Sequence, residues 1–418
     1  MAQFTRVGVA ESQIGQQTEA NIEANVEANV EPGCAACAVA GERKETRTSA
    51  VIFPLGPYHP LLPEPYALRL RLHGEQVVAA TAPATGYGRR DLLDLVRGQP
   101  IEDALVVLER VCAHAGQGYR LALSIAIERA ARMTAPRSAQ LTRVFFAELE
   151  MALSALWSLS ELARALNMRG LRTQGLEQRE RIYEAAANAT GQRVYWAIAR
   201  PGGVREGIQI EEVAAQFTWM RETVEGWRVT TAPRGVLRAV AERVDARQVK
   251  PQRESDSVAS DEAALPVEAG VAPLAYEDAR RSAPYDGYRA ITVDWTPLDD
   301  LPPGGVADVT SCALRLVTRL KLSYDIMHVC AETLSDSPRG QGSGALRAGQ
   351  GSATIQTAHG PARIEVTLAN DQTVADVRIT TPCAEALTRA PTGLLGRTLA
   401  DVPATLVGLD LCPSCADL

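Results

Sequence analysis

The sequence predicts an α+β fold, in which a central bundle of long helices carries an N-terminal β-hairpin and a small C-terminal antiparallel sheet. Three observations lead to this prediction. Leucines alternate with charged or polar residues over residues 68–73. Apolar residues then recur every three or four positions through residues 101–189. Residues 353–380 finally divide into three short β-type segments separated by turn residues.

The overall composition excludes several classes of protein. The chain has 418 residues, of which 46% are hydrophobic and 22% charged, so it is neither disordered nor fibrous. Its 43 Lys and Arg residues are outnumbered by 50 Asp and Glu residues, and the net charge of -7 argues against a nucleic-acid partner. The first residues lack the apolar core of a signal peptide, and no apolar run is long enough to span a bilayer. We therefore expect a cytoplasmic chain.

The chain divides into a tail and one large domain. Residues 1–50 are predicted to be a disordered tail, because residues 19–31 repeat a Glu-Ala-Asn unit that has no apolar face. The domain covers residues 51–418 and opens with a proline-rich, extended segment over residues 54–65. A hairpin follows over residues 66–80, with its turn at Gly74.

The helical core is predicted over residues 95–245. Helical spacing from Ile101 to Ala115 resumes through Ile127, which indicates one long helix or a broken pair and places Cys112 on a core helix. Pro136 suits the first turn of the next helix, over residues 141–166, and a further helix over residues 176–189 ends near Gly191. These helices are expected to pack as antiparallel neighbours.

A polar segment separates this core from the C-terminal part of the domain. Residues 246–268 are rich in Ser, Asp, Glu, Gln and Pro and are predicted to be a linker. The C-terminal part covers residues 269–418. It is expected to contain a helix over residues 308–331, the three strands within residues 353–380, and an apolar segment over residues 394–409.

Two CxxC pairs are the first chemical signal. Eight cysteines are too few for a disulfide scaffold of this length. A CxxC turn directs two thiolates at one metal ion or forms a redox pair. Cys34 and Cys37 lie in the predicted tail, where an exposed pair without fixed geometry is expected. Cys412 and Cys415 end the chain, where they are metal or redox ligands, a disulfide, or relics without present chemistry.

The remaining cysteines are single. Cys112 has an apolar neighbourhood, so it is either a metal ligand or a small buried hydrophobe. Cys312, Cys330 and Cys383 are expected to be core residues.

Ordered sequence blocks resemble one family along most of the chain from about residue 55. They are GPYHP at 56–60 with EP at 64–65, GEQV at 74–77, GYGRR at 86–90, ERVC at 109–112, PRSAQLTR at 136–143 with ELE at 148–150, TGQR at 190–193 with RPGGVR at 200–205, and DLCPSC at 410–415. They resemble motifs of nickel-iron hydrogenase large subunits, in particular of the membrane-bound, energy-converting, formate-hydrogenlyase-like branch. They equally resemble motifs of the D (49-kDa) subunit of respiratory complex I.

Departures from the family pattern affect the metal site. In the active hydrogenases, two CxxC pairs supply four thiolates to a binuclear nickel-iron centre, whereas Ala115 here replaces one of these cysteines. The sequence QTAHG at 356–360 replaces an E-x-P-R-G turn whose arginine lies over the metal site in the family. An intact NiFe centre is therefore not expected. The resemblance instead implies one mononuclear ion (Ni, Fe or Zn) on Cys112, Cys412 and Cys415, or a quinone, or no bound cofactor.

The same resemblance suggests the other site residues. The residues expected to act in catalysis are His59, Arg89, Arg90 and Arg110, and those expected to bind a cofactor such as a quinone are His59, Val107 and His114. Histidines suit proton transfer because their pKa lies near neutral pH. Each of the two histidines has an alternative interpretation as a hydrogen-bonded structural residue, and the arginines have one as partners in structural ion pairs.

The resemblance implies a subunit of an oxidoreductase complex of the NADH-quinone oxidoreductase or hydrogenase type. Nickel, quinone and NAD chemistry belong to the two branches of the family. The expected partners are an iron-sulfur small subunit and membrane subunits that translocate protons or other ions, so that the chain attaches peripherally to the inner side of the cell membrane. Reduction is expected at a cavity where residues 110–115 meet residues 412–415 and 86–90. The alternative is a catalytically silent structural or coupling subunit.

Overall fold

The computed structural model describes residues 51–60, 62, 64–87, 90–249, 278–282, 285–301, 308–335, 342 and 344–418. The predicted tail and the predicted linker from residue 250 onward lie outside these residues. The first residues of the predicted linker are anchored to the C-terminal part of the chain. The Val249 amide donates to the Gly396 carbonyl over 3.0 Å, and the Gln248 side chain donates to the Leu395 carbonyl over 2.8 Å.

The N-terminal sheet has three antiparallel strands, β1 (Val51–Leu55), β2 (Leu68–His73) and β3 (Gln76–Ala80). The leucines of β2 are buried and the intervening residues exposed, as their alternation predicts. The predicted hairpin is therefore present, but the prediction missed β1. Pro54 has no N–H to donate to the sheet. β1 tolerates it because β1 is an edge strand.

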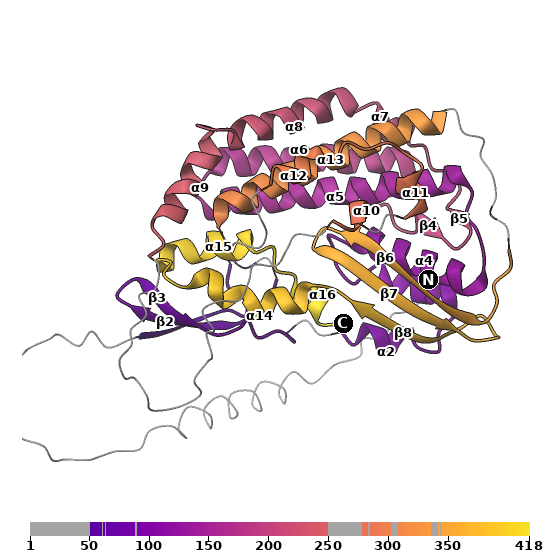
Figure 1. Cartoon of the computed structure of the whole chain (residues 1–418), viewed down its shortest axis with the longest axis horizontal. Coiled ribbons are helices and arrows are strands. Elements are labelled where there is room, and N and C mark those ends of the chain that lie inside the picture. The colour runs from indigo at the N-terminus through magenta and orange to yellow at the C-terminus, as the bar shows by residue number, and fades with distance from the viewer. Residues whose placement is uncertain are drawn as a thin grey trace, which may run out of the picture. The chain divides into compact units, whose positions relative to one another are not determined.

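Three long helices form the central bundle: α5 (Arg137–Ala165), α6 (Arg169–Thr190) and α13 (Val309–Ser335). Strong helix formers fill α5, and Pro136 stands directly before its first residue. Gly191 adopts a φ of 72°, which ends α6 in a left-handed turn. In Figure 1, α5 lies between α6 and the C-terminal elements, with α13 along its length. Within the described residues, no helix combines the length and apolar character that a bilayer crossing requires.

Shorter elements surround the bundle. They are α2 (Leu92–Val96), β4 (Ala199–Arg200), β5 (Gly203–Val204), α7 (Glu211–Ala214), α8 (Phe217–Thr231), α9 (Val236–Ala246), α10 (Ala279–Ser282), α11 (Asp286–Arg289) and α12 (Thr296–Asp299). β4 and β5 pair in a small antiparallel ladder, and α8 packs against α13.

The helical pattern from residue 101 to residue 131 is broken in the structure. It forms α3 (Ile101–Leu108) and α4 (Gly116–Ala131), so Cys112 lies in the intervening loop and its predicted place on a core helix is wrong. A β-carbon at residue 116 would lie 2.3 Å from the Glu109 carbonyl oxygen. Glycine at this position therefore lets the loop fold back on itself, and the loop presents Cys112 between the two helices.

The C-terminal sheet is an antiparallel meander of β6 (Gly349–Thr357), β7 (Gly360–Leu368) and β8 (Val374–Thr380). Thr357 pairs with Gly360, so a two-residue turn of Ala358 and His359 joins β6 to β7. Both strands pack on α4, and a β-carbon at Gly118 would lie 3.1 Å from the Thr357 side chain. This close approach places the turn beside the loop that carries Cys112.

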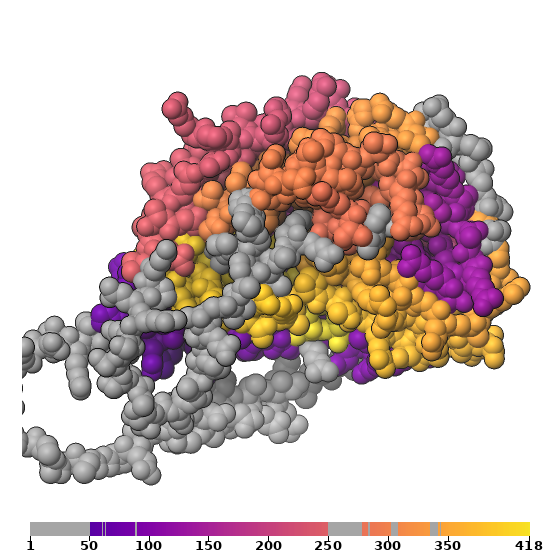
Figure 2. Space-filling model, in the orientation of Figure 1, coloured from indigo at the N-terminus to yellow at the C-terminus, as the bar shows by residue number. Residues whose placement is uncertain are grey.

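The chain ends with α14 (Cys383–Leu394), the short 3-10 helix η1 (Leu399–Asp401), α15 (Val402–Gly408) and α16 (Pro413–Ala416). In Figure 1 these yellow elements lie between the long helices and the N-terminal sheet, and Figure 2 shows their atoms filling this level of the molecule. Their apolar side chains form a core with β2 and β3, including Leu70, Leu394 and Leu406. The predicted α+β fold is confirmed.

Candidate metal centre

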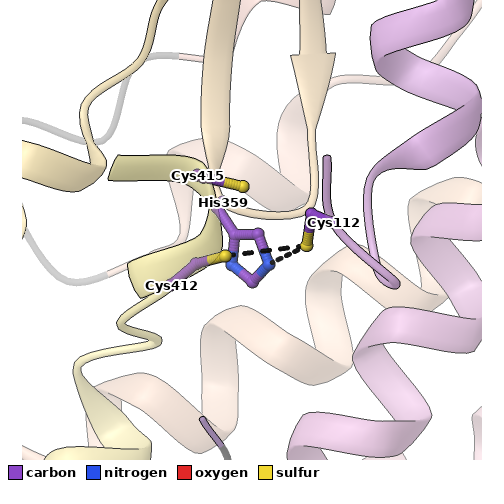
Figure 3. Close-up of side chains that lie close together, drawn as sticks. All are labelled: Cys112, His359, Cys412 and Cys415. Atoms are coloured by element: carbon purple, nitrogen blue, oxygen red, sulfur yellow. Dashed lines mark hydrogen bonds between the residues drawn. The ribbon is translucent and has the colours of Figure 1, made fainter. Parts of the chain in front are cut away.

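Three segments that are far apart in the sequence meet at one buried point. Cys112 comes from the loop between α3 and α4, His359 from the β6–β7 turn, and Cys412 and Cys415 from the start of α16 (Figure 3). One ligand atom from each residue lies within 4.8 Å of all the others. The exposed fractions of Cys112, Cys412 and Cys415 are 3%, 1% and 1%, so solvent hardly reaches the thiols.

The spacing of these atoms suits a single metal ion. The Cys112 Sγ atom lies 3.6 Å from the Cys412 Sγ atom and 3.6 Å from the His359 Nε2 atom. Zinc-sulfur bonds of about 2.3 Å in a tetrahedral site separate neighbouring sulfur ligands by about 3.8 Å. The observed spacing therefore needs only small adjustments to place an ion among the four residues.

A carboxylate lies on the other side of the histidine ring. The His359 Nδ1 atom is 3.7 Å from the Asp410 Oδ1 atom. Asp410 is itself fixed, because Arg319 donates to its Oδ2 atom over 3.2 Å and the Ser158 hydroxyl donates to its Oδ1 atom over 3.4 Å. Burial opposes the ionised carboxylate, but His359 and Arg319 outweigh it and lower the pKa of Asp410.

Hydrogen bonds hold the chain end in place around the site. The Ser414 amide donates to the Glu64 carboxylate over 2.9 Å, and the Gly86 amide donates to Asp417 over 2.5 Å. The Thr381 hydroxyl donates to the Cys415 carbonyl over 3.0 Å. Cys412 directly precedes Pro413, which occupies the first helical position of α16. The two terminal thiols are thus held by the protein itself, although they lie within seven residues of the chain end.

The thiols interact strongly with one another and with His359. Hydrogen bonds from Cys412 and Cys415 lower the pKa of the Cys112 thiol well below its ordinary value. Burial disfavours the charged form of His359, but the charges of Cys412 and Cys112 raise its pKa well above its ordinary value. The cluster therefore favours a deprotonated sulfur at Cys112, which is the state that binds metal.

Other buried groups border the cluster. Burial raises the pKa of Glu64, whose Oε1 atom lies 3.7 Å from the Cys412 Sγ atom. Burial also raises the pKa of Tyr119, and its hydroxyl has no hydrogen-bond partner among the described residues. Cys383 was expected to be a core residue, and it is indeed buried, but its thiol interacts with Cys415.

Two of the predicted arginines lie at the loop that carries Cys112, where they contact backbone carbonyls and a tryptophan ring. Arg90 donates to the carbonyls of Arg110 and Val111 over 2.8 Å and 2.5 Å, so it holds the loop that carries Cys112. Arg110 is exposed and lies over the Trp196 ring, with 4.9 Å between its guanidinium carbon and the ring centroid. Arg89 lies outside the described residues.

The residues predicted to bind a cofactor are dispersed. His59 is half-buried in the loop after β1, where its carbonyl accepts a hydrogen bond from the Leu62 amide. Val107 is partly buried against the main core. His114 lies nearest to the cluster, with its ring centroid 6.3 Å from that of His359, but it stacks on Trp157. Burial lowers the pKa of His114 to about 4, so it is neutral at physiological pH.

Sequence reasoning brought the three cysteines together but missed His359 and Asp410 as neighbours of the site. The available signal was the turn at residues 356–360, where the family has an arginine over its metal. A histidine at that position carries a ring nitrogen that can bind a metal ion, whereas an arginine offers none.

Buried ion pairs lie in the helices and short segments next to the site. Arg280 pairs with Glu148 and Asp278 over 2.8 Å and 2.6 Å, and Arg143 pairs with Glu128 over 2.5 Å. Glu148 is therefore part of a structural network. Glu150, two residues further along α5, accepts hydrogen bonds from the Gln117 and Gly118 amides, and burial raises its pKa to about 8.

Comparisons with known proteins agree with this architecture. No protein-family model matches the chain. The chain is 29% identical over 153 residues to the D subunit of NADH-quinone oxidoreductase from Thermosipho melanesiensis, covering 37% of this chain and 41% of that protein. It is 26% identical over 298 residues to the corresponding D subunit from Brucella anthropi, covering 71% and 72% of the two chains. It is also 27% identical over 167 residues to the D subunit of F(420)H(2) dehydrogenase from Methanosarcina mazei, covering 38% and 43%.

A solved structure has the same fold. A chain of the membrane-bound sulfane sulfur reductase, an archaeal respiratory membrane complex, matches with a TM-score of 0.72 and 21% identity, covering 90% of this chain and 100% of that chain. This chain therefore shares its fold with a chain of that respiratory complex. In sequence, the chain is similar to D subunits of NADH-quinone oxidoreductase and of F(420)H(2) dehydrogenase.

Proposed function

We propose that this chain is the large subunit of a membrane-associated redox complex related to NADH-quinone oxidoreductase. It attaches to the membrane through partner subunits and receives electrons from an iron-sulfur small subunit. The D subunits that resemble it and the fold shared with a chain of an archaeal respiratory membrane complex support this role. We assign the iron-sulfur clusters to a partner, since the buried cluster among the described residues combines three cysteines with one histidine rather than four cysteines.

The second part of the proposal is that the buried site holds one metal ion. The convergence of Cys112, Cys412 and Cys415 is the observation that carries it, because three buried thiols within 4.8 Å of one another offer the sulfur ligands that one soft metal ion takes. A binuclear NiFe centre does not fit this donor set. The family's centre uses four thiolates, and Ala115 leaves this site with three.

Two versions of the function differ in what the ion does. In the first, the ion keeps an open coordination position, and a substrate is reduced there or at a neighbouring quinone site that includes His59. In the second, the ion has no open position and the subunit couples or supports its partners without reacting itself. The identity of a fourth ligand separates the two versions.

The experiment that tests the assembly is purification of the chain through an affinity tag from detergent-solubilised membranes of its source cells. We expect an iron-sulfur protein and at least one membrane protein to co-purify in fixed stoichiometry, with iron and acid-labile sulfide in the preparation. Dissociation of the partners should leave this chain without those clusters. A monodisperse single chain that reduces a redox substrate without any partner would contradict the proposal.

A further inference from the structure

We infer that His359 is the fourth ligand of the ion and closes the site as a tetrahedral centre of three cysteines and one histidine, of the kind that zinc prefers. This inference rests on the single-ion site proposed above. It goes further by assigning the ligand, the metal class and the role of the site. The donor set is soft and has one imidazole, which suits zinc in structural sites.

The position of the imidazole is the first argument. The His359 Nε2 atom lies 3.6 Å from the Cys112 Sγ atom, which equals the distance between the Cys112 and Cys412 sulfur atoms. In Figure 3 the ring projects from the β6–β7 turn toward the three thiols, with one ring nitrogen directed at Cys112. The imidazole is therefore as close to Cys112 as the Cys412 thiol is, which suits a fourth ligand of the same ion.

The second argument is the carboxylate behind the ring. Histidines that bind metals nearly always have their other ring nitrogen oriented by a carboxylate, carbonyl or water. The His359 Nδ1 atom faces Asp410 at 3.7 Å, and it has no closer hydrogen-bond partner among the described residues. Arg319 and Ser158 hold that carboxylate from the far side. A carboxylate in this position favours a proton on Nδ1, so an ion would bind at Nε2 in place of the proton that Nε2 shares with Cys112.

The third argument is the backbone that delivers the ring. Ala358 and His359 form a two-residue turn, and the Thr357 hydroxyl accepts a hydrogen bond from the His359 amide over 3.3 Å. The turn is pressed against α4 near Gly118. A rigid turn of this kind fixes the ligand before the ion binds, which lowers the entropic cost of binding.

The consequence is a structural role for the ion. Four protein ligands leave no open position on a tetrahedral ion, and the thiols are almost completely buried. The ion then ties the Cys112 loop, the β6–β7 turn and the chain end together. The ion itself then takes no part in reduction, as in the second version of the proposed function.

X-ray absorption spectroscopy on the zinc-loaded or cobalt-loaded complex tests the inference. We expect three sulfur ligands at about 2.3 Å and one nitrogen ligand at about 2.0–2.1 Å. In the His359→Cys variant the nitrogen should be replaced by a fourth sulfur, with the ion retained. This change identifies the ligand even if the His359→Ala variant fails to fold.

Affinity measurements add a quantitative readout. Removal of an outer-shell partner lowers metal affinity by 10–100-fold, so His359→Ala should lower it by at least about 100-fold. The His359→Ala site should also gain an open position, so that added imidazole changes the cobalt absorption spectrum. His114→Ala is the matched control, because its ring lies beside that of His359 and stacks on Trp157, and His114 is not among the four residues of the cluster. It should leave the three-sulfur, one-nitrogen shell unchanged.

The outcomes separate the inference from the proposal on which it rests. A bound ion with three sulfur ligands and an oxygen ligand, unaffected by His359→Cys, would overturn the inference and leave the single-ion site intact. An absence of zinc and cobalt binding under reducing conditions would overturn the single-ion proposal itself. In that case Cys112 and His359 would form a metal-free hydrogen-bonded pair.

Discussion

Two buried polar regions of this protein differ in whether they are complete without a ligand. In the helical region, two guanidinium groups face three buried carboxylates: Arg280 lies between Glu148 and Asp278, and Arg143 pairs with Glu128. At the chain end, three thiols and an imidazole face one another, with no guanidinium or ammonium group among the four. The first region satisfies its own charges, whereas the second collects donors that only a shared proton or a metal ion can satisfy.

Buried ionisable groups without an opposite charge nearby are the better candidates for binding an ion. Buried ionisable residues are numerous in this chain, and most of them are explained by an opposite charge at hydrogen-bond distance. Glu148 belongs to this group, since Arg280 and the Tyr288 hydroxyl both donate to it. The group of like donors at residues 112, 359, 412 and 415 needs an external partner, and it is therefore the better candidate for a bound ion.

The largest expected effect comes from removing a guanidinium from the ion pairs of the helical region. Arg280→Met should lower the free energy of unfolding by about 3–5 kcal/mol, because it leaves two carboxylates buried without a cation. Chemical denaturation measures this loss. Arg228→Met is the matched control, since its pair with Glu225 is exposed and should contribute at most about 1 kcal/mol. Metal content should be the same in both variants, and a loss of the ion in Arg280→Met alone would contradict the separation of the two regions.

A smaller effect, on metal affinity, is expected from Asp410, the carboxylate next to the His359 ring. Asp410→Asn keeps the shape of the side chain but weakens its interaction with the His359 ring. We expect zinc affinity to fall by about 10–100-fold, or about 1.4–2.7 kcal/mol, with the ligand shell unchanged. Competition with a chromophoric chelator measures the affinity. An affinity equal to that of the unmodified chain would show that the carboxylate does not orient the ring.

The pH dependence of stability tests a third buried group. The pKa of Glu150 is about 8 in the folded chain and near 4.5 when exposed. Between these values the folded state holds a proton that the unfolded state releases, so stability falls as pH rises from about 4.5 to about 8, by at most about 1.4 kcal/mol per pH unit. Glu150→Gln should remove this part of the slope. Denaturation curves at several pH values check it, and parallel slopes in the two proteins would refute the assignment.

The smallest expected effect concerns Arg90, which the resemblance suggested as a catalytic residue. Its exposed guanidinium holds two carbonyls of the Cys112 loop. Arg90→Gln should therefore lower metal affinity by less than about tenfold, since the loop keeps its other contacts. The same chelator competition measures this. A complete loss of redox activity in the assembled complex, with the metal retained, would instead support the catalytic interpretation.

Periodicity predicted the regular parts of the fold. The alternation in β2, the long apolar stripe of α5 and the turn at Gly191 were all visible, because each depends on neighbouring residues. The first strand was missed because Pro54, followed by several more prolines, suggests an extended coil unless the partner strand is known. The loop at Cys112 was missed for a similar reason, since the close approach of Gly116 to Glu109 is a contact that no periodicity reveals.

Some residues of the site were likewise visible in the sequence, and others were not. The cysteines were visible because CxxC spacing and the family motifs mark them. His359 lies in a hairpin turn more than 50 residues from the terminal pair, and only the packing of that turn on α4 brings it to the thiols. The orienting role of Asp410 likewise depends on Arg319 of α13, whose position the sequence does not give.

The metal content of the complex, measured after purification under reducing conditions, tests the central claim most directly. Native mass spectrometry and elemental analysis should find about one tightly bound ion per chain in the unmodified protein. The Cys412→Ser, Cys415→Ser double variant should lose it, whereas a Cys312→Ser, Cys330→Ser double variant, which removes two buried cysteines outside the four-residue cluster, should keep it. An unmodified complex without a stoichiometric metal, or an ion that survives the loss of both terminal thiols, would contradict the account.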